Sequence, residues 1–470
     1  MRLSDDAHGL RSAMKMCHWV QRGVGRDTLG LLAILILSAF FAAELPVAAD
    51  DSVSIYRSAH VELYTDMDAT RVKSQLQRID RVLEFSQRYW QRPLVGRIRC
   101  YLVNDLATWR SFDFPEPTAR RVLRRIGGGT NLERQSDGKG KSQAVVYATT
   151  EPGVLEHEVV HAYCFQTFGH GGPAWYREGM AELIGQRLDT DPGAPCRAST
   201  LQLLRQSSGY TLAQLTKHEG DFTAALKNSA GRHAQTQEKA AIRVSLDDDN
   251  TMALKVGIEP QTWSDDDHAA LQAARIDYAY SWAACYFLSQ HRSYRERFRC
   301  YGQHVMCGAK ISLADAFGDA TPQVEFEFAQ FLNNIEAGYR VDLCHWQWHE
   351  KQPARPLEIG AARVVQVRSA LGYQPAGVQV ESGSQYRISA TGSWQLGPES
   401  EKISADGDDD GGQLEIVTLE GHTLSSPTLL GTNNLWRASR TGTVYLRCRD
   451  AWGELSDNRG SMSVHIKRIE

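Results

Sequence analysis

The apolar residues of this chain change their spacing near Gln352–Pro356, and this change limits the folds that the chain can adopt. Before it, long segments such as Ala69–Trp90 repeat apolar residues at helical spacing. After it, short alternating segments stand between turn signals, a pattern typical of a β-sandwich. We therefore predict a multidomain chain: an α+β domain over residues 50–350, a Pro-containing linker at 351–357 and an all-β sandwich over 358–470.

The apolar spacing also predicts the elements of both parts. In the first part we expect strands at Ala59–Thr65, Arg97–Val103 and Ala144–Ala148, and helices at Ala69–Trp90, Leu155–Phe168, Ile276–His291 and Phe326–Tyr339. In the second part we expect strands at Val364–Val367, Gly377–Val380, Gln385–Ala390, Gln413–Val417, Asn434–Arg437, Gly442–Cys448 and Ser461–Ile466. Loops are expected at Gly127–Gly129, at Lys139–Ser142 and at the acidic triplets Asp247–Asp249 and Asp265–Asp267, although such triplets could instead bind Ca²⁺.

The N-terminal residues have the composition of an export signal. Arg22 and Arg26 precede the apolar run Leu29–Ala43, and Val47–Ala49 offers small residues for cleavage. We expect residues 1–49 to be a signal peptide, which makes the mature protein secreted or periplasmic. The alternative is an uncleaved N-terminal membrane anchor. No later segment is long and apolar enough to span a bilayer.

Charge and cysteine content agree with an exported protein. The formal net charge of −4 gives no general attraction to nucleic acid. Nine cysteines are present, and loss of Cys17 with the signal would leave an even number. In an oxidising compartment some of them are expected to form disulfides, while Cys164 on the apolar side of its helix is expected to be a core residue.

His157, Glu158 and His161 stand in the order His-Glu-x-x-His within Leu155–Phe168. Residues four apart on a helix lie on one face, one turn from each other. The two imidazoles can therefore hold one Zn²⁺, and Glu158 lies close enough to polarise a water at the metal. This order predicts a zinc-binding helix in which Glu158 is the general base.

A second helix is expected to supply the third ligand. Gly171-Gly172-Pro173 predicts a turn, after which Glu178 and Glu182 follow at a spacing of one helical turn. One carboxylate would complete a His₂Glu site with an open position for water, and the other would hydrogen-bond a ligating imidazole. The alternative is that both glutamates belong to an ordinary solvated helix face.

The two segments together, the second spelled Trp-x-x-Glu-Gly-x-Ala-Glu from Trp175 to Glu182, resemble the gluzincin metallopeptidases. The greatest resemblance is to peptidase MA-like domains of bacterial secreted proteins, over roughly residues 54–339. It implies a zincin-like fold, hydrolysis of peptide bonds, Glu178 as the third zinc ligand and Glu182 behind the ligands.

The same resemblance implies two further parts of a peptidase site. A Tyr or His generally stabilises the oxyanion opposite the zinc, and Tyr278 is the first candidate and Tyr280 the second. Packing in the aromatic core is the alternative for either tyrosine. The strand Ala144–Ala148, just before the zinc helix, is expected to form the cleft edge to which an extended peptide adds by β-pairing.

The sandwich has a resemblance of its own. Gly377–Gly397 and Gly442–Ile466 are similar to the galactose-binding, calcium-dependent bacterial lectins of the PA-IL type. The resemblance implies a Ca²⁺ site made by the loop residues Asp450, Glu454, Asp457 and Asn458 and by a carbonyl near Leu396. The family's sugar-contacting loop is not recognisable between Ser400 and Leu414, and Glu454 replaces a neutral Thr. We therefore expect calcium binding without strong galactose binding; the alternative is a plain structural sandwich.

Together these patterns predict a secreted zinc peptidase that acts on peptides or proteins. Its C-terminal sandwich would bind Ca²⁺ or attach the enzyme to a glycan or cell surface. The rival hypothesis is a binding protein, in which an MA-like domain with little or no catalytic activity acts as a scaffold for adhesion by the sandwich.

Overall fold

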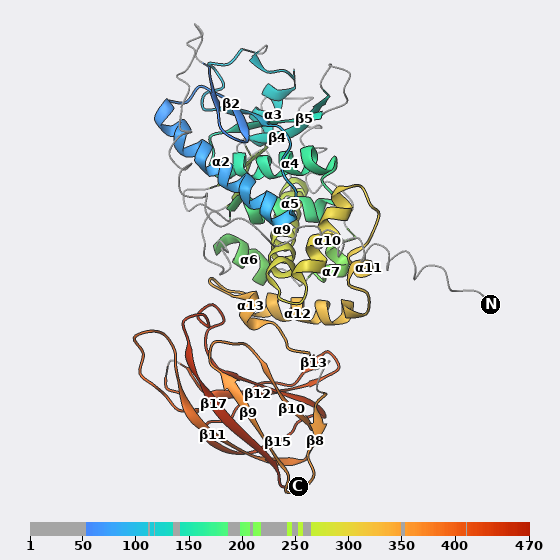
Figure 1. Cartoon of the computed structure of the whole chain (residues 1–470), viewed down its shortest axis with the longest axis vertical. Helices are drawn as coiled ribbons and strands as arrows, with labels where there is room; N and C mark the ends of the chain where they lie inside the picture. The colour runs from blue at the N-terminus through green and yellow to red at the C-terminus, as the bar shows by residue number, and fades with distance from the viewer. Residues whose placement is uncertain are drawn as a thin grey trace, which may run out of the picture. The chain divides into compact units, whose positions relative to one another are not determined.

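The structure is a computed structural model, in which Ala48–Glu470 forms one compact unit. It describes residues 53–110, 113–116, 118–134, 142–186, 198–206, 210–217, 242–246, 252–256, 265–348, 353–409 and 411–470. The predicted signal peptide, Cys17, Cys196 and Asp247–Asp249 lie outside the described residues. Within the described part of the chain, helices and several sheets make a mixed α+β molecule, as the sequence predicts (Figure 1).

A five-stranded sheet underlies the first part of the chain. Its central strands β2 (Val61–Thr65), β3 (Ile98–Val103) and β5 (Ser142–Thr149) run parallel. The strands β1 (Ser54–Arg57) and β4 (Gly128–Arg134) pair antiparallel to β2 and β5 and form the two edges. The three sequence-predicted strands are thus present, with ends shifted by one to two residues.

The sheet is buried on both faces, because successive side chains of a strand point to opposite sides. On β3, Cys100 and Leu102 belong to the large core that also contains α2 and α4, whereas Tyr101 and Val103 face a smaller aromatic cluster with Trp109. This double burial explains why the β3 segment is apolar at nearly every position.

The prediction of a loop at Gly127–Gly129 is wrong, because Gly128 and Gly129 begin the edge strand β4. A Cβ on Gly128 would lie 2.6 Å from Cγ1 of Val154 and 3.1 Å from Cγ of Glu158. The glycine is therefore needed where the strand packs against the helix that carries the His-Glu-x-x-His segment. It follows that β4, and not β5, is the sheet edge beside that helix.

Helices form the rest of the first part. They are α2 (Ala69–Trp90), α3 (Ala119–Ile126), α4 (Val154–Phe168), α5 (Ala174–Gln186), α6 (Ala198–Gln206), α7 (Leu212–Leu215), α9 (Asp265–Gln290), α10 (Arg295–Met306), α11 (Leu313–Phe317), η4 (Gly318–Ala320), α12 (Thr321–Asn334) and α13 (Val341–Cys344), with a hairpin of β6 (Ile242–Leu246) and β7 (Met252–Val256) before α9.

The ends of these helices follow local capping rules. Asp68 caps α2 by accepting a hydrogen bond from the Arg71 amide, and Gly169 ends α4 with a φ of 85°. Two sequence predictions need correction. Asp265–Asp267 is the first turn of α9 rather than a loop. Acidic residues are favourable at this end of a helix, because the helix dipole is positive there. The helix predicted at Phe326–Tyr339 ends at Asn334.

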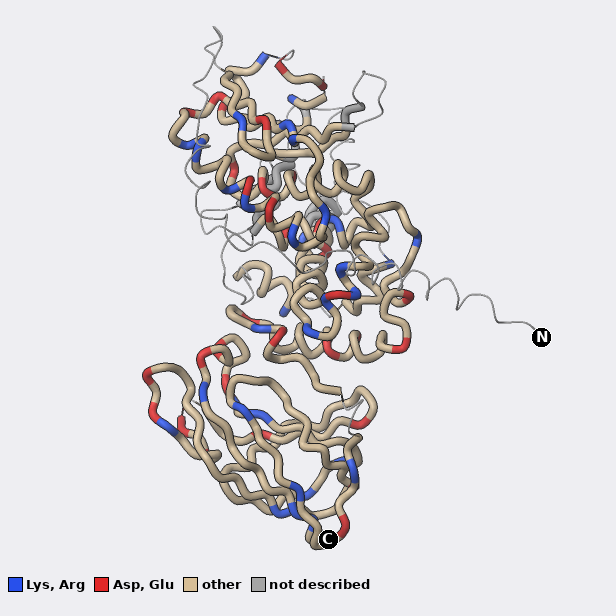
Figure 2. Tube along the Cα trace, viewed as in Figure 1, with Lys and Arg blue, Asp and Glu red and all other residues tan. Residues whose placement is uncertain are grey.

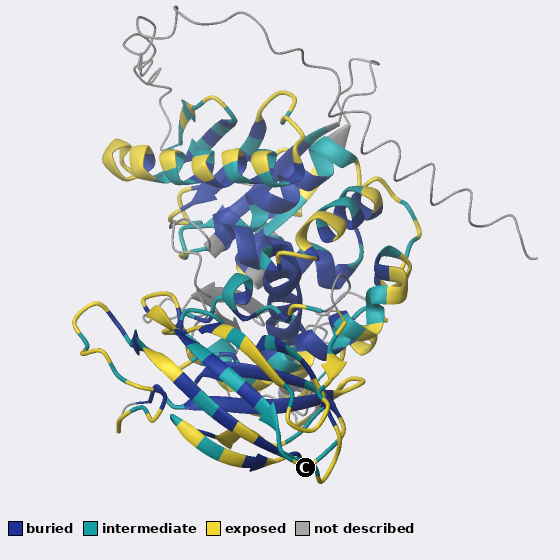
Figure 3. Cartoon of the chain, turned by 60° about the horizontal axis from the view of Figure 1, so that its bottom comes forward, coloured by how far each residue is buried: buried dark blue, intermediate teal, exposed yellow. Residues whose placement is uncertain are grey.

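Helix α9 is the central element of this core. Its residues from Tyr280 to Leu288 are almost completely buried, as Figure 3 shows for the long helix in the middle of the molecule. No helix in the described part of the chain has both the length and the apolar composition needed to cross a membrane.

The second part is a sandwich of two sheets. One sheet has the order β13 (Thr423–Leu424), β12 (Leu414–Glu420), β16 (Gly442–Cys448), β10 (Gln374–Val380) and β8 (Arg355–Pro356), with β14 (Thr428–Leu429) beside β12. The other has the order β15 (Asn433–Arg437), β11 (Gln385–Gln395), β17 (Arg459–Arg468) and β9 (Ala362–Arg368). Burial alternates along β10 and β11. Because Arg355–Pro356 pairs with β10, the end of the predicted linker belongs to this sheet.

The cysteines do not behave as the export argument predicts. Among the described residues, Cys100, Cys164, Cys285, Cys344 and Cys448 are buried thiols that form no disulfide. Burial raises the pKa of the Cys164 thiol well above its usual value, so this thiol is a small core residue, as expected.

A buried carboxylate, Glu327 on α12, fastens the segment that leads into the sandwich. It accepts hydrogen bonds from the Trp346 amide at 2.9 Å and from Nε1 of Trp348 at 2.7 Å. It also bonds Nε2 of His291 at 2.7 Å and accepts from the Tyr294 hydroxyl. Burial alone would raise the pKa of Glu327, but these bonds outweigh it and hold the pKa below its usual 4.5.

We expect Glu327→Ala to destabilise the protein by about 3 kcal/mol or more, because several buried donors would lose their acceptor. Urea unfolding at pH 7 measures this loss. The contribution should be complete above pH 4.5 and disappear as the pH falls through the lowered pKa of Glu327. Glu296→Ala, at a side chain 63% exposed, is the control and should cost less than about 1 kcal/mol. Equal costs for the two variants would contradict this account.

Candidate metal centre

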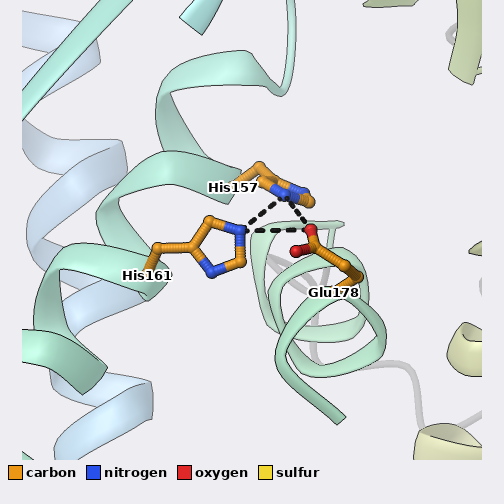
Figure 4. Close-up of side chains that lie close together, drawn as sticks. All are labelled: His157, His161 and Glu178. Atoms are coloured by element: carbon orange, nitrogen blue, oxygen red, sulfur yellow. Dashed lines mark hydrogen bonds and ion pairs between the residues drawn. The ribbon is translucent and has the colours of Figure 1, made fainter. Parts of the chain in front are cut away.

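Helices α4 and α5 bring two histidines and one glutamate together. His157 and His161 lie one turn apart on α4, and Glu178 comes from the first half of α5. Figure 4 shows the three side chains pointing toward one another. Within the described residues, they form the one group of three His, Cys, Asp or Glu side chains whose candidate ligand atoms all lie within 4.8 Å.

The separations of the ligand atoms fit a tetrahedral metal. Nε2 of His157 and Nε2 of His161 are 2.9 Å apart, and Oε2 of Glu178 lies 3.3 Å from each. Zinc bonds of about 2.0–2.1 Å at tetrahedral angles place neighbouring ligand atoms about 3.3 Å apart. A small outward shift of one imidazole, which would separate the two Nε2 atoms, therefore suffices to accommodate Zn²⁺.

Glu182 orients the first histidine from behind. Its Oε1 lies 2.8 Å from Nδ1 of His157 and holds the ring with Nε2 toward the ligand group. Once a metal takes the lone pair of Nε2, the remaining proton of the imidazole lies on Nδ1, toward Glu182. Burial by itself would lower the pKa of His157, but hydrogen bonds to Glu178 and Glu182 outweigh burial and raise the pKa well above its usual value. The pair of buried carboxylates thus makes this pocket attractive to a cation.

Glu178 presents only one oxygen to the histidines. Its Oε1 accepts a hydrogen bond of 2.8 Å from Nε of Arg177, while Oε2 faces the imidazoles. Burial alone would raise the pKa of Glu178, but His161 and His157 together hold it well below its usual value. The carboxylate is therefore ionised, the form in which it can act as a ligand.

Two glycines of α5 allow the close helix packing that builds this centre. A Cβ on Gly185 would lie 3.2 Å from the His157 amide nitrogen, and a Cβ on Gly179 would lie 2.3 Å from the Ser281 carbonyl oxygen of α9. Larger residues there would push α5 away from α4 and α9. The Gly in the Trp-x-x-Glu-Gly segment thus has a packing role beside a candidate ligand.

The other expected site residues lie nearby, with one exception. Glu158 is next to His157 on α4 and is not part of the ligand group. The hydroxyl of Tyr278, on α9, donates to Oε2 of Glu178 at 3.4 Å, so the first oxyanion candidate reaches the centre. Tyr280 is 1% exposed and packs against Tyr210, so it is a core residue.

Two residues at the centre were missed by sequence reasoning. Arg177 bonds the third candidate ligand, and its only signal was its position next to Glu178. Thr130 on β4 donates its hydroxyl to Oε2 of Glu158 at 2.8 Å. Thr130 stands two residues after Gly128, a spacing that could have indicated a strand. The three consecutive glycines led instead to the prediction of a loop.

The sandwich loop expected to bind Ca²⁺ is assembled only in part. Asn458 donates from Nδ2 to Oδ2 of Asp450 at 2.7 Å. Asp457 has its Oδ2 3.6 Å from where a Cβ of Gly397 would stand, next to Leu396. Glu454 is exposed, and among the described residues the three acidic side chains do not form a group close enough to share a metal.

This loop also packs against the helical part of the chain. Leu455 is fully buried in the core shared with α9 and α12, and Trp452 stacks on Tyr339 with 6.1 Å between ring centroids. The Gly453 amide donates to Oε1 of Glu336 at 2.7 Å. The loop predicted to bind Ca²⁺ therefore forms part of an internal contact in this protein.

No protein-family model matches the chain, and no curated protein matches it. Among solved structures, one described as the EclA N-terminal domain, a PllA-like lectin, is similar at 21% identity with a TM-score of 0.19. The similarity covers 23% of this chain and 95% of that structure.

We expect the purified protein to contain one zinc ion, and His161→Ala to lose it, because the remaining two ligands cannot close the site. Glu182→Gln should bind zinc about 10–100-fold more weakly, since it weakens the bond that orients His157. Elemental analysis and competition with a chelating dye measure both. His304→Ala, an exposed histidine on α10, is the control. Undiminished zinc in His161→Ala would exclude this site.

Proposed function

We propose that the chain is an extracytoplasmic zinc peptidase that hydrolyses peptide bonds. The observation that carries the proposal is the triangle of Nε2, Nε2 and Oε2 from His157, His161 and Glu178, with edges of 2.9, 3.3 and 3.3 Å. The neighbouring Glu158 and the Tyr278 hydroxyl supply the acid, base and hydrogen-bond donor that hydrolysis needs.

Each residue has a defined part in the proposed reaction. When zinc is bound, it supplies the Lewis acidity that activates water and polarises the peptide carbonyl. Glu158 accepts a proton from the attacking water and delivers it to the leaving amine. Tyr278 donates a hydrogen bond to the oxygen on which negative charge develops. Glu182 keeps His157 in the tautomer with Nε2 toward the ligand group.

The edge strand β4 suits an extended peptide substrate. It is the last strand of the five-stranded sheet, and its residue Gly128 touches the helix that carries Glu158. A peptide that added to this edge would be held by main-chain hydrogen bonds near the proposed base. The substrate edge expected at Ala144–Ala148 is thus replaced in the proposal by the neighbouring strand.

The partners follow from the same arguments. Lys, Arg, Asp and Glu are mixed along the described chain, as Figure 2 shows, so we expect no general electrostatic attraction to nucleic acid. The proposed partner is a peptide or protein substrate. The apolar run at Leu29–Ala43 supports export, whether by a cleaved signal or an anchor. A scaffold without catalysis is the competing function.

We expect Glu158→Gln to keep zinc but to lose at least about 10²–10⁴-fold in peptide hydrolysis, because an amide cannot accept the proton. A fluorogenic peptide library measures the activity and elemental analysis measures the metal. Glu296→Gln, a surface carboxylate, is the control. Equal activity of wild type and Glu158→Gln would refute the mechanism, and two inactive proteins with bound zinc would favour the scaffold.

A second candidate function, Ca²⁺ binding by the sandwich, is supported by one buried group. Asn458 is 5% exposed, and its Oδ1 has no hydrogen-bond partner among the described residues. The Nδ2 of the same amide donates to Oδ2 of Asp450, so a buried carbonyl oxygen and a carboxylate belong to neighbouring side chains of one loop, and oxygen donors of this kind suit a hard cation. Asp457 and the carbonyl near Leu396 would be further ligands. Glycan binding through this cation, which the resemblance to the PA-IL lectins implies, is a weaker proposal because the loop packs internally.

We expect millimolar Ca²⁺ to raise the melting temperature of the full chain; an excess of a hundredfold over Kd stabilises by about 2.7 kcal/mol. The double variant Asp450→Ala with Asp457→Ala should lose this rise, and Glu399→Ala, exposed in the same sandwich, should keep it. The full chain is required because Leu455 is buried against the helical part. An unchanged wild-type melting temperature would refute the site, and a glycan array tests the expected weak galactose binding.

A further inference from the structure

The side chain of Glu158 is held by a residue outside the candidate ligand group. The Thr130 hydroxyl lies 2.8 Å from Oε2 of Glu158 and 2.9 Å from the Glu158 carbonyl oxygen. A hydroxyl has one proton, so it donates to one of these acceptors at a time. The bond to the carboxylate is favoured, because bonds to ionised acceptors are about twice as strong as neutral ones.

The position of Thr130 follows from the packing of β4 on α4. Side chains two residues apart on a strand point to the same face, so Thr130 lies on the face of Gly128. Gly128 lets the strand approach α4 closely, because a Cβ at this position would lie 2.6 Å from Cγ1 of Val154 and 3.1 Å from Cγ of Glu158. Pairing of β4 with β5 from Gly128↔Ala148 to Arg134↔Ser142 fixes the register, and with it the place of the hydroxyl.

We propose that Thr130 is a positioning residue for Glu158, and this inference rests on the proposed peptidase function. A free glutamate side chain populates several rotamers, and fixing it costs up to about 1.5–2 kcal/mol of entropy. The Thr130 bond fixes Oε2 before substrate arrives and leaves Oε1 to accept the proton of the attacking water. Catalytic orientation of this kind raises kcat more than it lowers KM.

The position of this threonine has a second consequence. Thr130 belongs to the edge strand that the proposal assigns to the peptide, so one strand both pairs with substrate and orients the base. A peptide that binds β4 out of register would disturb the strand that holds Glu158. The arrangement therefore couples correct substrate pairing to a correctly placed base.

The test compares two substitutions at this position. Thr130→Val keeps the β-branched shape and removes the hydroxyl, whereas Thr130→Ser keeps the hydroxyl. Loss of a hydrogen bond to a charged group corresponds to roughly a 10- to 100-fold fall in kcat for Thr130→Val. KM should change less than about threefold and zinc content should not change. Thr130→Ser should retain most of the wild-type kcat.

A second readout does not require turnover. Acetohydroxamate binds zinc and offers a hydroxyl to a carboxylate beside it, so its affinity reports the placement of Glu158. Calorimetry should show weaker binding to Thr130→Val and to Glu158→Gln than to wild type, and near wild-type binding to Thr130→Ser. Wild-type kcat and affinity in Thr130→Val would overturn the inference.

The remaining outcomes are also decisive. Equal losses in the Ser and Val variants would overturn the inference, because they would show that packing and not the hydroxyl matters. An inactive wild type whose acetohydroxamate affinity falls only in Thr130→Val and Glu158→Gln would refute the peptidase function and still support Thr130 as the residue that positions Glu158.

Discussion

The candidate site depends on how closely α5 approaches its two neighbours. Gly185 admits the backbone of α4 at His157, and Gly179 admits the backbone of α9 at Ser281. These contacts place Glu178 and Glu182 against the histidine pair and bring the Tyr278 hydroxyl to Glu178. A methyl group at Gly179 would lie 2.3 Å from the Ser281 carbonyl oxygen and force the two helices apart, and one at Gly185 would make a tight contact of 3.2 Å with the His157 amide nitrogen. The chemistry proposed for the site is therefore a consequence of backbone packing.

The buried carboxylates of the site suit the metal ion that we propose for it. Glu178 and Glu182 are 8% and 5% exposed, and their partners are imidazoles that are neutral in a metal-bound state. Arg177 is a positive partner of Glu178, and Glu182 bonds His157. When both histidines are neutral, as ligation requires, a dication would balance the charge that remains on the two buried carboxylates. Arg177 and Thr130 extend the same logic outward, because each binds one oxygen of a carboxylate that the proposed reaction uses.

The loop of the sandwich for which the sequence predicts a calcium site also contacts the helical part of the chain. The segment from Asp450 to Asn458 buries Leu455 in the helical core and bonds Glu336 through Gly453. Stability of the loop and stability of the helical part are thus linked. Binding of a cation near Asn458 would act on that contact, which is why the calcium experiment uses the whole chain.

The sequence by itself determined the elements that local spacing controls. Apolar periodicity located α2 at Ala69–Trp90 and β16 at Gly442–Cys448, since periods of 3.6 and two follow from backbone geometry. The spacing of His157 and His161 put both on one face of α4 for the same reason.

Only the tertiary structure decided the rest. It turned the Gly128 segment into an edge strand, made Asp265 the start of a helix, and left Cys100 and Cys285 as buried thiols. It also separated Tyr278, which reaches Glu178, from Tyr280, which is in the core. Residues two apart on a helix point in different directions. Which of their side chains meets a partner depends on elements that are distant in the chain. Thr130 and Glu158 are such a pair, because strand packing rather than sequence spacing brings them together.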